Sequence, residues 1–147
     1  MFKHILVPVD GSPTSLAAID KAIGLSKSFG STVTAIYVID PYPFTGVGAD
    51  FAYGQDQYLS AAKAEASAAI DAVSARLAEA GIPVDTRVVE SHAVWRGILE
   101  ASEAVGADLV VMGSHGRRGL EKLVLGSVTQ SVLSHTKLTT LVVRDAS

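Results

Sequence analysis

The feature that most constrains the fold is a regular alternation of short apolar runs with longer segments of helical periodicity. Most of the runs are nearly continuous Val, Ile and Leu, which is typical of parallel strands covered by helices on both faces. A repeated strand-helix order favours an open doubly wound sheet over a bundle or a sandwich. We therefore expect an α/β fold with helices on both faces of a mostly parallel sheet of five strands: Ile5–Val9, Thr32–Ile39, Val84–Val89, Asp108–Met112 and Thr139–Val143.

Four segments carry the helical pattern. Ser12 supplies an N-cap for the first of them, and Pro13 fits its first helical position. Glycine follows the first three segments as a C-terminal stop. The expected helices are residues 14–29, 57–80, 94–105 and 128–134.

Residues 41–54, PYPFTGVGADFAYG, form a stretch with neither pattern. Prolines and glycines predict an irregular segment here. Its four aromatic residues make it too apolar for an ordinary linker. Two interpretations remain, a surface loop that packs its own rings on the body, or a lid over a ligand or a partner surface.

Length, charge and composition limit the possible classes. The chain has 147 residues, so we expect one domain over residues 1–147. A net charge of −3 provides no general attraction to nucleic acid, and the absence of cysteine excludes disulfides and thiol chemistry. No stretch approaches the roughly 20 apolar residues of a membrane span, and the N-terminal apolar run is too short for a signal peptide. We expect a cytoplasmic protein with neither a nucleic-acid nor a membrane partner.

Two turns of small residues follow the first and fourth predicted strands. Ligands of doubly wound sheets bind beyond the carboxyl ends of the strands, where the strand order reverses. The turns 8–12 and 113–116 should therefore meet across one crevice. Glycine accepts positive φ and lets a ligand approach the backbone. We expect Gly113 and Gly116 to bend the chain so that N–H groups face an anion.

A second small pair, Gly126-Ser127, precedes the last predicted helix. Ser127 and Gln130 have the spacing of a capping box, which predicts Ser127 as the N-cap of a helix that faces an anion. The helix dipole contributes only ~0.3–1 kcal/mol, whereas micromolar affinity requires about 8 kcal/mol. Several N–H donors at roughly 1.5–3 kcal/mol each, together with burial of a flat base, could supply the difference. A triphosphate carrying an adenine suits such a site.

The glycine pattern matches neither common nucleotide motif, since G-x-x-x-x-G-K-[ST] and G-x-G-x-x-G are both absent. Gly113-x2-Gly116-x9-Gly126-Ser127 instead resembles the G-x2-G-x9-G-[ST] motif of ATP-binding universal stress proteins. The resemblance extends to Val7–Asp10, Tyr37–Asp40, Ala107–Met112 and Leu141–Val143.

This resemblance implies an ATP-binding dimer whose five strands have the order 3-2-1-4-5. Mg²⁺ or Mn²⁺ would be carried on the phosphates, with no metal site of the protein's own. The residues implied near adenine and ribose are Pro8, Val9, Asp10, Val38 and Met112. Those implied near the phosphates are Gly113, Ser114, His115, Gly116, Arg117, Arg118, Gly119, Gly126, Ser127, Val128 and Thr129.

Some of these residues also have plainer interpretations. Asp10 could serve only the turn, since Asp-Gly-Ser favours turns, or could contact the ribose or a metal-bound water. Arg117 and Arg118 could be solvated charges or phosphate contacts. His115 has no carboxylate near it in the sequence, which favours a contribution from its backbone N–H over a role as a general base. The remaining histidines lack the spacing of metal ligands.

The last predicted strand is an apolar edge with no proline, and such an edge normally needs cover. Pairing of residues 138–144 with the same strand of a second copy predicts a homodimer. We expect an ATP-binding regulator or sensor in the stress response, with a protein partner of unknown identity.

Three alternatives remain to be weighed against the regulator. Without a positioned base and a water-orienting group, any ATP hydrolysis should be slow, so a slow ATPase is one alternative. An interaction module without nucleotide is another, although its glycine pattern should be degraded. An ATP-cleaving adenylating ligase should show S-G-G-x-D-S after the first strand, where this chain has Asp10-Gly11-Ser12-Pro13.

Overall fold

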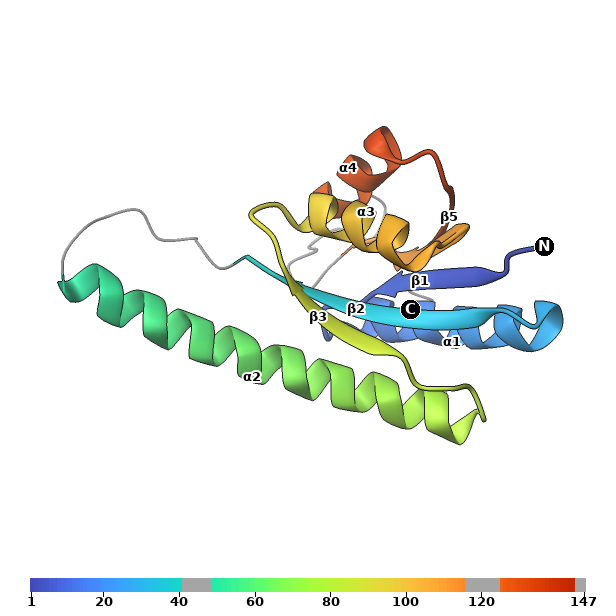
Figure 1. Cartoon of the computed structure of the whole chain (residues 1–147), viewed down its shortest axis with the longest axis horizontal. Helices are drawn as coiled ribbons and strands as arrows, with labels where there is room; N and C mark the ends of the chain where they lie inside the picture. The colour runs from blue at the N-terminus through green and yellow to red at the C-terminus, as the bar shows by residue number, and fades with distance from the viewer. Residues whose placement is uncertain (41–48, 116–124, 145–147) are drawn as a thin grey trace.

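The computed structural model describes residues 1–40, 49–115 and 125–144. Five strands form one sheet in the order β3-β2-β1-β4-β5, and every neighbouring pair is parallel (Figure 1). The predicted α/β fold and strand order are therefore confirmed. The elements are β1 (His4–Pro8), α1 (Pro13–Phe29), β2 (Thr32–Ile39), α2 (Ala49–Glu79), β3 (Thr86–Glu90), α3 (Val94–Val105), β4 (Leu109–Gly113), α4 (Ser127–His135) and β5 (Thr139–Val143).

Helices cover both faces of the sheet, α1 and α2 on one face and α3 and α4 on the other (Figure 1). The two faces divide the side chains of β1 between two cores. Ile5 and Val7 belong to the core under α1 and α2, whereas Leu6 between them belongs to the core under α3 and α4. Extended backbone sends successive side chains to opposite faces. Because both faces are covered, all three residues are fully buried, and the strand reads as a continuous apolar run.

The two edge strands are less protected than the central ones. Val88 of β3 is 48% exposed and Leu141 of β5 is 40% exposed. The strands that are well covered on both faces are therefore the central ones, β1, β2 and β4, and the prediction of an open edge at the last strand is consistent with the exposure of Leu141. The physical reason is that the four helices lie mainly over the centre of the sheet.

Helix α2 is longer than the sequence predicted, because it begins at Ala49 and not at residue 57. Residues 49–54 of the predicted irregular segment are thus helical, and residues 41–48 lie outside the described part of the chain. The prolines that indicated irregular structure, Pro41 and Pro43, both precede Ala49. Gly54 was a weak signal, since glycine inside a helix costs only about 0.5–1 kcal/mol relative to alanine.

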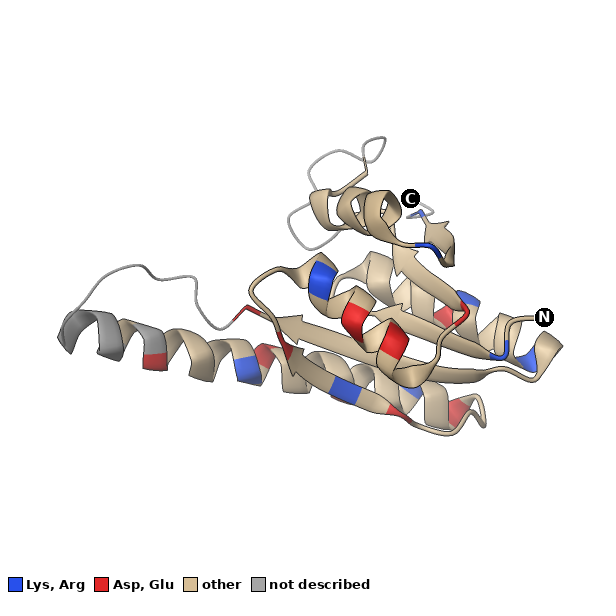
Figure 2. Ribbon diagram, turned by 45° about the horizontal axis from the view of Figure 1, so that its top comes forward, with Lys and Arg blue, Asp and Glu red and all other residues tan. Residues whose placement is uncertain are grey.

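Charges of both signs lie along the described part of α2 (Figure 2). One of them, Arg76, forms an ion pair of 2.6 Å with Asp20 of α1. Both partners are largely exposed to solvent, so the pair contributes at most about 1 kcal/mol to stability. Within the described segments, no helix combines the length and the hydropathy required to cross a membrane.

Candidate functional site

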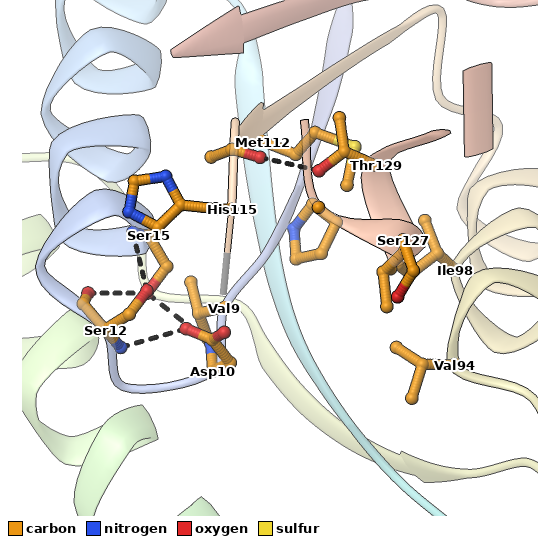
Figure 3. Close-up of a pocket in the computed structure, with 14 residues that line it drawn as sticks. Val9, Asp10, Ser12, Ser15, Val94, Ile98, Met112, His115, Ser127 and Thr129 are labelled. Carbon is orange, nitrogen blue, oxygen red and sulfur yellow. Dashed lines mark hydrogen bonds between the residues drawn. The ribbon is translucent and has the colours of Figure 1, made fainter. Parts of the chain in front are cut away.

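A cavity of about 420 Å³ lies at the carboxyl ends of β1 and β4 (Figure 3). The helix that follows β1, α1, covers one face of the sheet, and the helix that follows β4, α4, covers the other, so the strand order reverses at this point. The described residues that line it are Pro8, Val9, Asp10, Ser12, Ser15, Val94, Ile98, Met112, Gly113, His115, Gly126, Ser127, Val128 and Thr129.

The turn between β1 and α1 is held by a compact set of hydrogen bonds. The Ser12 N–H donates to Asp10 Oδ1 at 2.9 Å, and the Ser15 N–H donates to Ser12 Oγ at 3.2 Å. The predicted cap of α1 by Ser12 is therefore confirmed. Gly11 has a φ of +83°, a backbone conformation that favours glycine. Asp10 thus shapes the turn, while its contact with a ribose or a metal-bound water stays a prediction.

Gly113 has a different role from the one expected. It does not have a positive φ, so the expectation that it bends the chain by that route is wrong. A Cβ at this position would lie 3.0 Å from Thr14 Cβ and 3.3 Å from the Thr14 carbonyl carbon. Glycine leaves room for this approach, because the end of β4 passes close to the first turn of α1. This close approach brings the two predicted turns together.

Helix α4 begins one residue earlier than a capping box would place it. Gly126 is the N-cap, Ser127 is the first helical residue, and no side chain of the described residues caps this end. The predicted capping box is therefore wrong. The Gln130 side chain donates instead to the Leu125 carbonyl at 2.8 Å, before the start of the helix.

Two hydrogen bonds attach the start of α4 to the end of β4 and explain this shift. The Gly126 N–H donates to the Ser114 carbonyl at 2.7 Å, and the Thr129 hydroxyl donates to the Gly113 carbonyl at 2.9 Å. The first bond sets the extended backbone of Gly126 that makes it the cap. The first N–H groups of a helix have no partner within it, and here they belong to residues that line the cavity.

His115 lines the cavity next to the end of β4. Its Nε2 lies 3.4 Å from Thr14 Oγ1 and its Nδ1 lies 3.2 Å from Ser114 Oγ. Thr14 and Ser114 are each 2% exposed, so buried hydroxyls hold the ring on both sides. The side chain of His115 therefore belongs to the site, in addition to the backbone N–H that the sequence favoured.

The structure brings most of the predicted contact residues into the cavity wall. Two described ones do not line it. Ser114 is buried and supports the wall through its carbonyl. Val38 packs under α3, where a Cβ on Gly97 would lie 3.0 Å from Val38 Cγ1. Four more predicted residues lie outside the described part of the chain: Gly116, Arg117, Arg118 and Gly119.

An apolar wall contributed by α3 was missed by the sequence analysis. Val94 and Ile98 lie one turn apart and both line the cavity. Their spacing was visible, but it indicated only the core face of a helix. Ser15 was missed as well, and Ser12 was predicted to lie in the turn that faces the crevice but was not among the predicted contact residues.

The described residues of the cavity wall include two titratable side chains, Asp10 and His115. Nowhere in the described segments do three His, Asp or Glu side chains gather closely enough to hold a metal ion. The rest of the wall consists of apolar side chains, hydroxyls and backbone. Such a wall can receive a flat apolar group on the α3 side and a polar group beside α4.

The fold and this crevice define an open doubly wound α/β protein with a binding cavity at the switch point of its sheet. The model of the universal stress protein family matches residues 1–144. A universal stress protein of Methanocaldococcus jannaschii is 37% identical over 144 residues, which cover 98% of this chain and 83% of that protein. The chain therefore belongs to the universal stress protein family.

Solved structures show the same fold. A member of the family from Burkholderia pseudomallei is 28% identical, with a TM-score of 0.78, and the match covers 97% of this chain and 96% of that one. A universal stress protein solved in complex with cAMP is 24% identical, with a TM-score of 0.71 and a match that covers 97% of each chain. At that identity, the second likeness shows the fold alone.

Proposed function

We propose that this chain binds an adenine nucleotide, principally ATP, in the cavity at the switch point and acts as a nucleotide-dependent regulator or sensor in the stress response. One observation carries the proposal. The apolar wall of Val94 and Ile98 and the N-terminal end of α4, which no described side chain caps, line the same cavity.

The cavity fits a nucleotide in size and in chemistry. Its volume of about 420 Å³ lies within the range of roughly 300–1,000 Å³ for ligand sites. Burying the flat face of a base against Val94, Ile98 and Met112 contributes ~25 cal/mol for each Å² of apolar surface removed from water. N–H donors to charged oxygens add roughly 1.5–3 kcal/mol each. Three or four such donors reach micromolar affinity, about 8 kcal/mol, after ordering costs.

The phosphates belong at the start of α4. The N–H groups of Ser127, Val128 and Thr129 and the positive end of the helix dipole favour an anion there. Gly126 has no side chain that could obstruct this approach. The Gly113-x2-Gly116-x9-Gly126-Ser127 pattern supports the same assignment.

A divalent cation would accompany the phosphates. No three-ligand cluster exists in the described residues, so phosphate oxygens and water must supply most of the ligands to Mg²⁺ or Mn²⁺. Asp10 lines the cavity and can reach such an ion through a water molecule. When bound, the ion would neutralise phosphate charge.

The nucleotide acts as a signal and not as the substrate of an efficient enzyme. Of the two titratable side chains in the described wall, Asp10 accepts a hydrogen bond from its own turn and His115 lies between two hydroxyls. Neither arrangement pairs a base with a second group that orients water, as rapid phosphoryl transfer requires. We expect a turnover below about 1 s⁻¹, at the lower limit of ordinary enzymes.

A homodimer through β5 forms part of the proposal. Within the described strands β5 pairs only with β4, and its outward Leu141 is 40% exposed. Antiparallel pairing of β5 with its copy would cover this edge with two-fold symmetry.

The decisive experiment identifies the ligand directly. The purified protein is denatured, and any released nucleotide is identified by chromatography and mass, then ATP, ADP, AMP and cAMP are each titrated into nucleotide-free protein by calorimetry. We expect ATP to be released or to bind at micromolar concentration. Tighter binding of cAMP would replace ATP as the ligand, and no heat with any of the four would favour the interaction module without nucleotide.

A further inference from the structure

The surroundings of His115 suit an imidazole that changes its charge. Each ring nitrogen faces a hydroxyl, Thr14 Oγ1 at 3.4 Å from Nε2 and Ser114 Oγ at 3.2 Å from Nδ1. A hydroxyl can donate or accept a hydrogen bond. The ring therefore keeps both contacts whether it is neutral or protonated.

His135 shows the contrasting arrangement in the same molecule. Its Nδ1 lies 2.7 Å from the Ser131 carbonyl, which can only accept, so this nitrogen must carry the proton. His135 also stacks on Trp95 at 4.1 Å and does not line the cavity. The carbonyl oxygen at His135 thus fixes which ring nitrogen carries a proton, whereas the hydroxyls at His115 leave this open.

Few charged groups surround His115 among the described residues. Asp10 lies in the same cavity wall, and Thr14 lies in the first turn of α1. The described wall residues from α3 and α4 carry no charge, and no lysine or arginine lies among the described lining residues. A polyphosphate in the cavity would bring negative charge to the wall that His115 lines.

We propose that His115 is a specificity-determining residue that takes up one proton from solvent when a polyphosphate binds. The inference rests on the proposed function, because it assigns the phosphate-charge preference of the same site. The neutral imidazole gains a proton on the ring nitrogen that carries none and becomes an imidazolium, and no other covalent bond changes. Histidine side chains change charge between pH 5 and 8. At pH 6, a charged His115 therefore makes ATP bind more tightly than it would without this charge. The preference for ATP over cAMP is larger at pH 6 than at pH 8.

The test compares wild type with His115→Asn, which retains a polar side chain and cannot become a cation. ATP is titrated by calorimetry at pH 6 and pH 8, each in two buffers of different ionisation enthalpy, to count the protons taken up. The titration of ATP itself is common to both proteins and cancels in the comparison. We expect the variant to bind about tenfold more weakly than wild type at pH 6, the equivalent of one pKa unit, and nearly equally at pH 8. The wild type should also take up more protons.

Two further measurements secure the interpretation. His135→Gln removes a histidine outside the cavity and should leave proton uptake unchanged. Nitrogen NMR of the His115 ring in wild type, with and without ATP, answers the question even if His115→Asn fails to fold. An equal loss of affinity at both pH values, with no difference in proton uptake, overturns the role of His115 while ATP binding stands. A wild type that binds no ATP overturns the proposed function and this inference together.

Discussion

The hydroxyl of Thr129 on α4 donates a hydrogen bond of 2.9 Å to the carbonyl of Gly113 at the end of β4. Thr129 is 3% exposed, so this bond lies away from solvent. It joins the N-terminal end of α4 to the carboxyl end of β4. The bond thus sets where the first N–H groups of α4 lie relative to the cavity.

Removal of this hydroxyl should destabilise the protein and weaken nucleotide binding. Thr129→Val preserves the shape and leaves the Gly113 carbonyl without this donor, so we expect the free energy of unfolding to fall by about 1–3 kcal/mol. Urea denaturation measures the stability, and ATP titration measures the affinity. Thr129→Ser retains the hydroxyl and should lose less than half as much; equal losses in the two variants would assign the effect to packing.

Two helical glycines should respond oppositely to the same substitution. A Cβ at Gly97 would lie 3.0 Å from both Ser91 Cβ and Val38 Cγ1, whereas a Cβ at Gly24 meets nothing within 4 Å. We expect Gly97→Ala to lower the free energy of unfolding by about 1–3 kcal/mol through overpacking. Gly24→Ala should raise it by roughly 0.4–1 kcal/mol, because alanine is the better helix former. Thermal unfolding of both variants and of wild type measures the two changes in stability. Changes of the same sign would contradict the prediction.

Ser127 allows helix stability to be separated from nucleotide binding. It is the first residue of α4 and is exposed, so an acidic side chain there meets the positive end of the helix dipole. Ser127→Asp should stabilise the protein by about 0.3–1 kcal/mol, yet lower the affinity for ATP by roughly tenfold or more through repulsion of the phosphates. The matched neutral variant Ser127→Asn should bind nearly as wild type does. Unchanged ATP affinity in Ser127→Asp would show that the phosphates do not bind at this end of α4.

Asp108 makes stability depend on pH at the amino-terminal ends of β1 and β4, the end of the sheet opposite the cavity. Hydrogen bonds from the backbone N–H groups of Lys3 at 2.8 Å and His4 at 3.0 Å lower the pKa of this carboxyl below its ordinary value. A depressed folded pKa means that the stabilisation is fully present above the unfolded pKa and is lost as pH falls through the folded one.

Asp108→Asn should therefore be less stable than wild type at pH 7, and this difference should shrink as the pH falls from 4 toward 2. Urea unfolding at successive pH values measures it. Asp71→Asn, an exposed position on α2, is the control and should change stability little at any pH. A difference between wild type and Asp108→Asn that stays constant down to pH 2 would contradict the assignment.

The β5 edge provides the test of the proposed homodimer. Leu141 is 40% exposed on this strand, and Leu141→Lys places a charge where two copies would meet. We expect wild type to sediment as a dimer at micromolar concentration and Leu141→Lys to sediment as a monomer with an unchanged circular dichroism spectrum. Val88→Lys on the other edge, where the exposed fraction is 48%, should remain dimeric. A monomeric wild type would end the proposal.

The fold was predictable to a large extent because its signals are local. Continuous apolar runs such as Ile5–Val9 indicated strands buried on both faces, and Ser12-Pro13 indicated the start of α1. Each of these signals depends on a few neighbouring residues and on backbone geometry. The glycine pattern on which the resemblance to the family depends, Gly113-x2-Gly116-x9-Gly126-Ser127, is also visible in the sequence alone.

Tertiary structure decided what depends on residues far apart in the chain. The cap of α4 moved from Ser127 to Gly126 because a carbonyl of Ser114 accepts its N–H, and Gly113 is glycine because Thr14 lies against it. Val94 and Ile98 became a cavity wall only where α3 meets the carboxyl ends of the strands. The sequence by itself determined the elements and their layers, since periodicity is a local property. Only the packed structure decided the shape of the cavity, since that shape depends on contacts between segments up to about a hundred residues apart, such as Thr14 with His115.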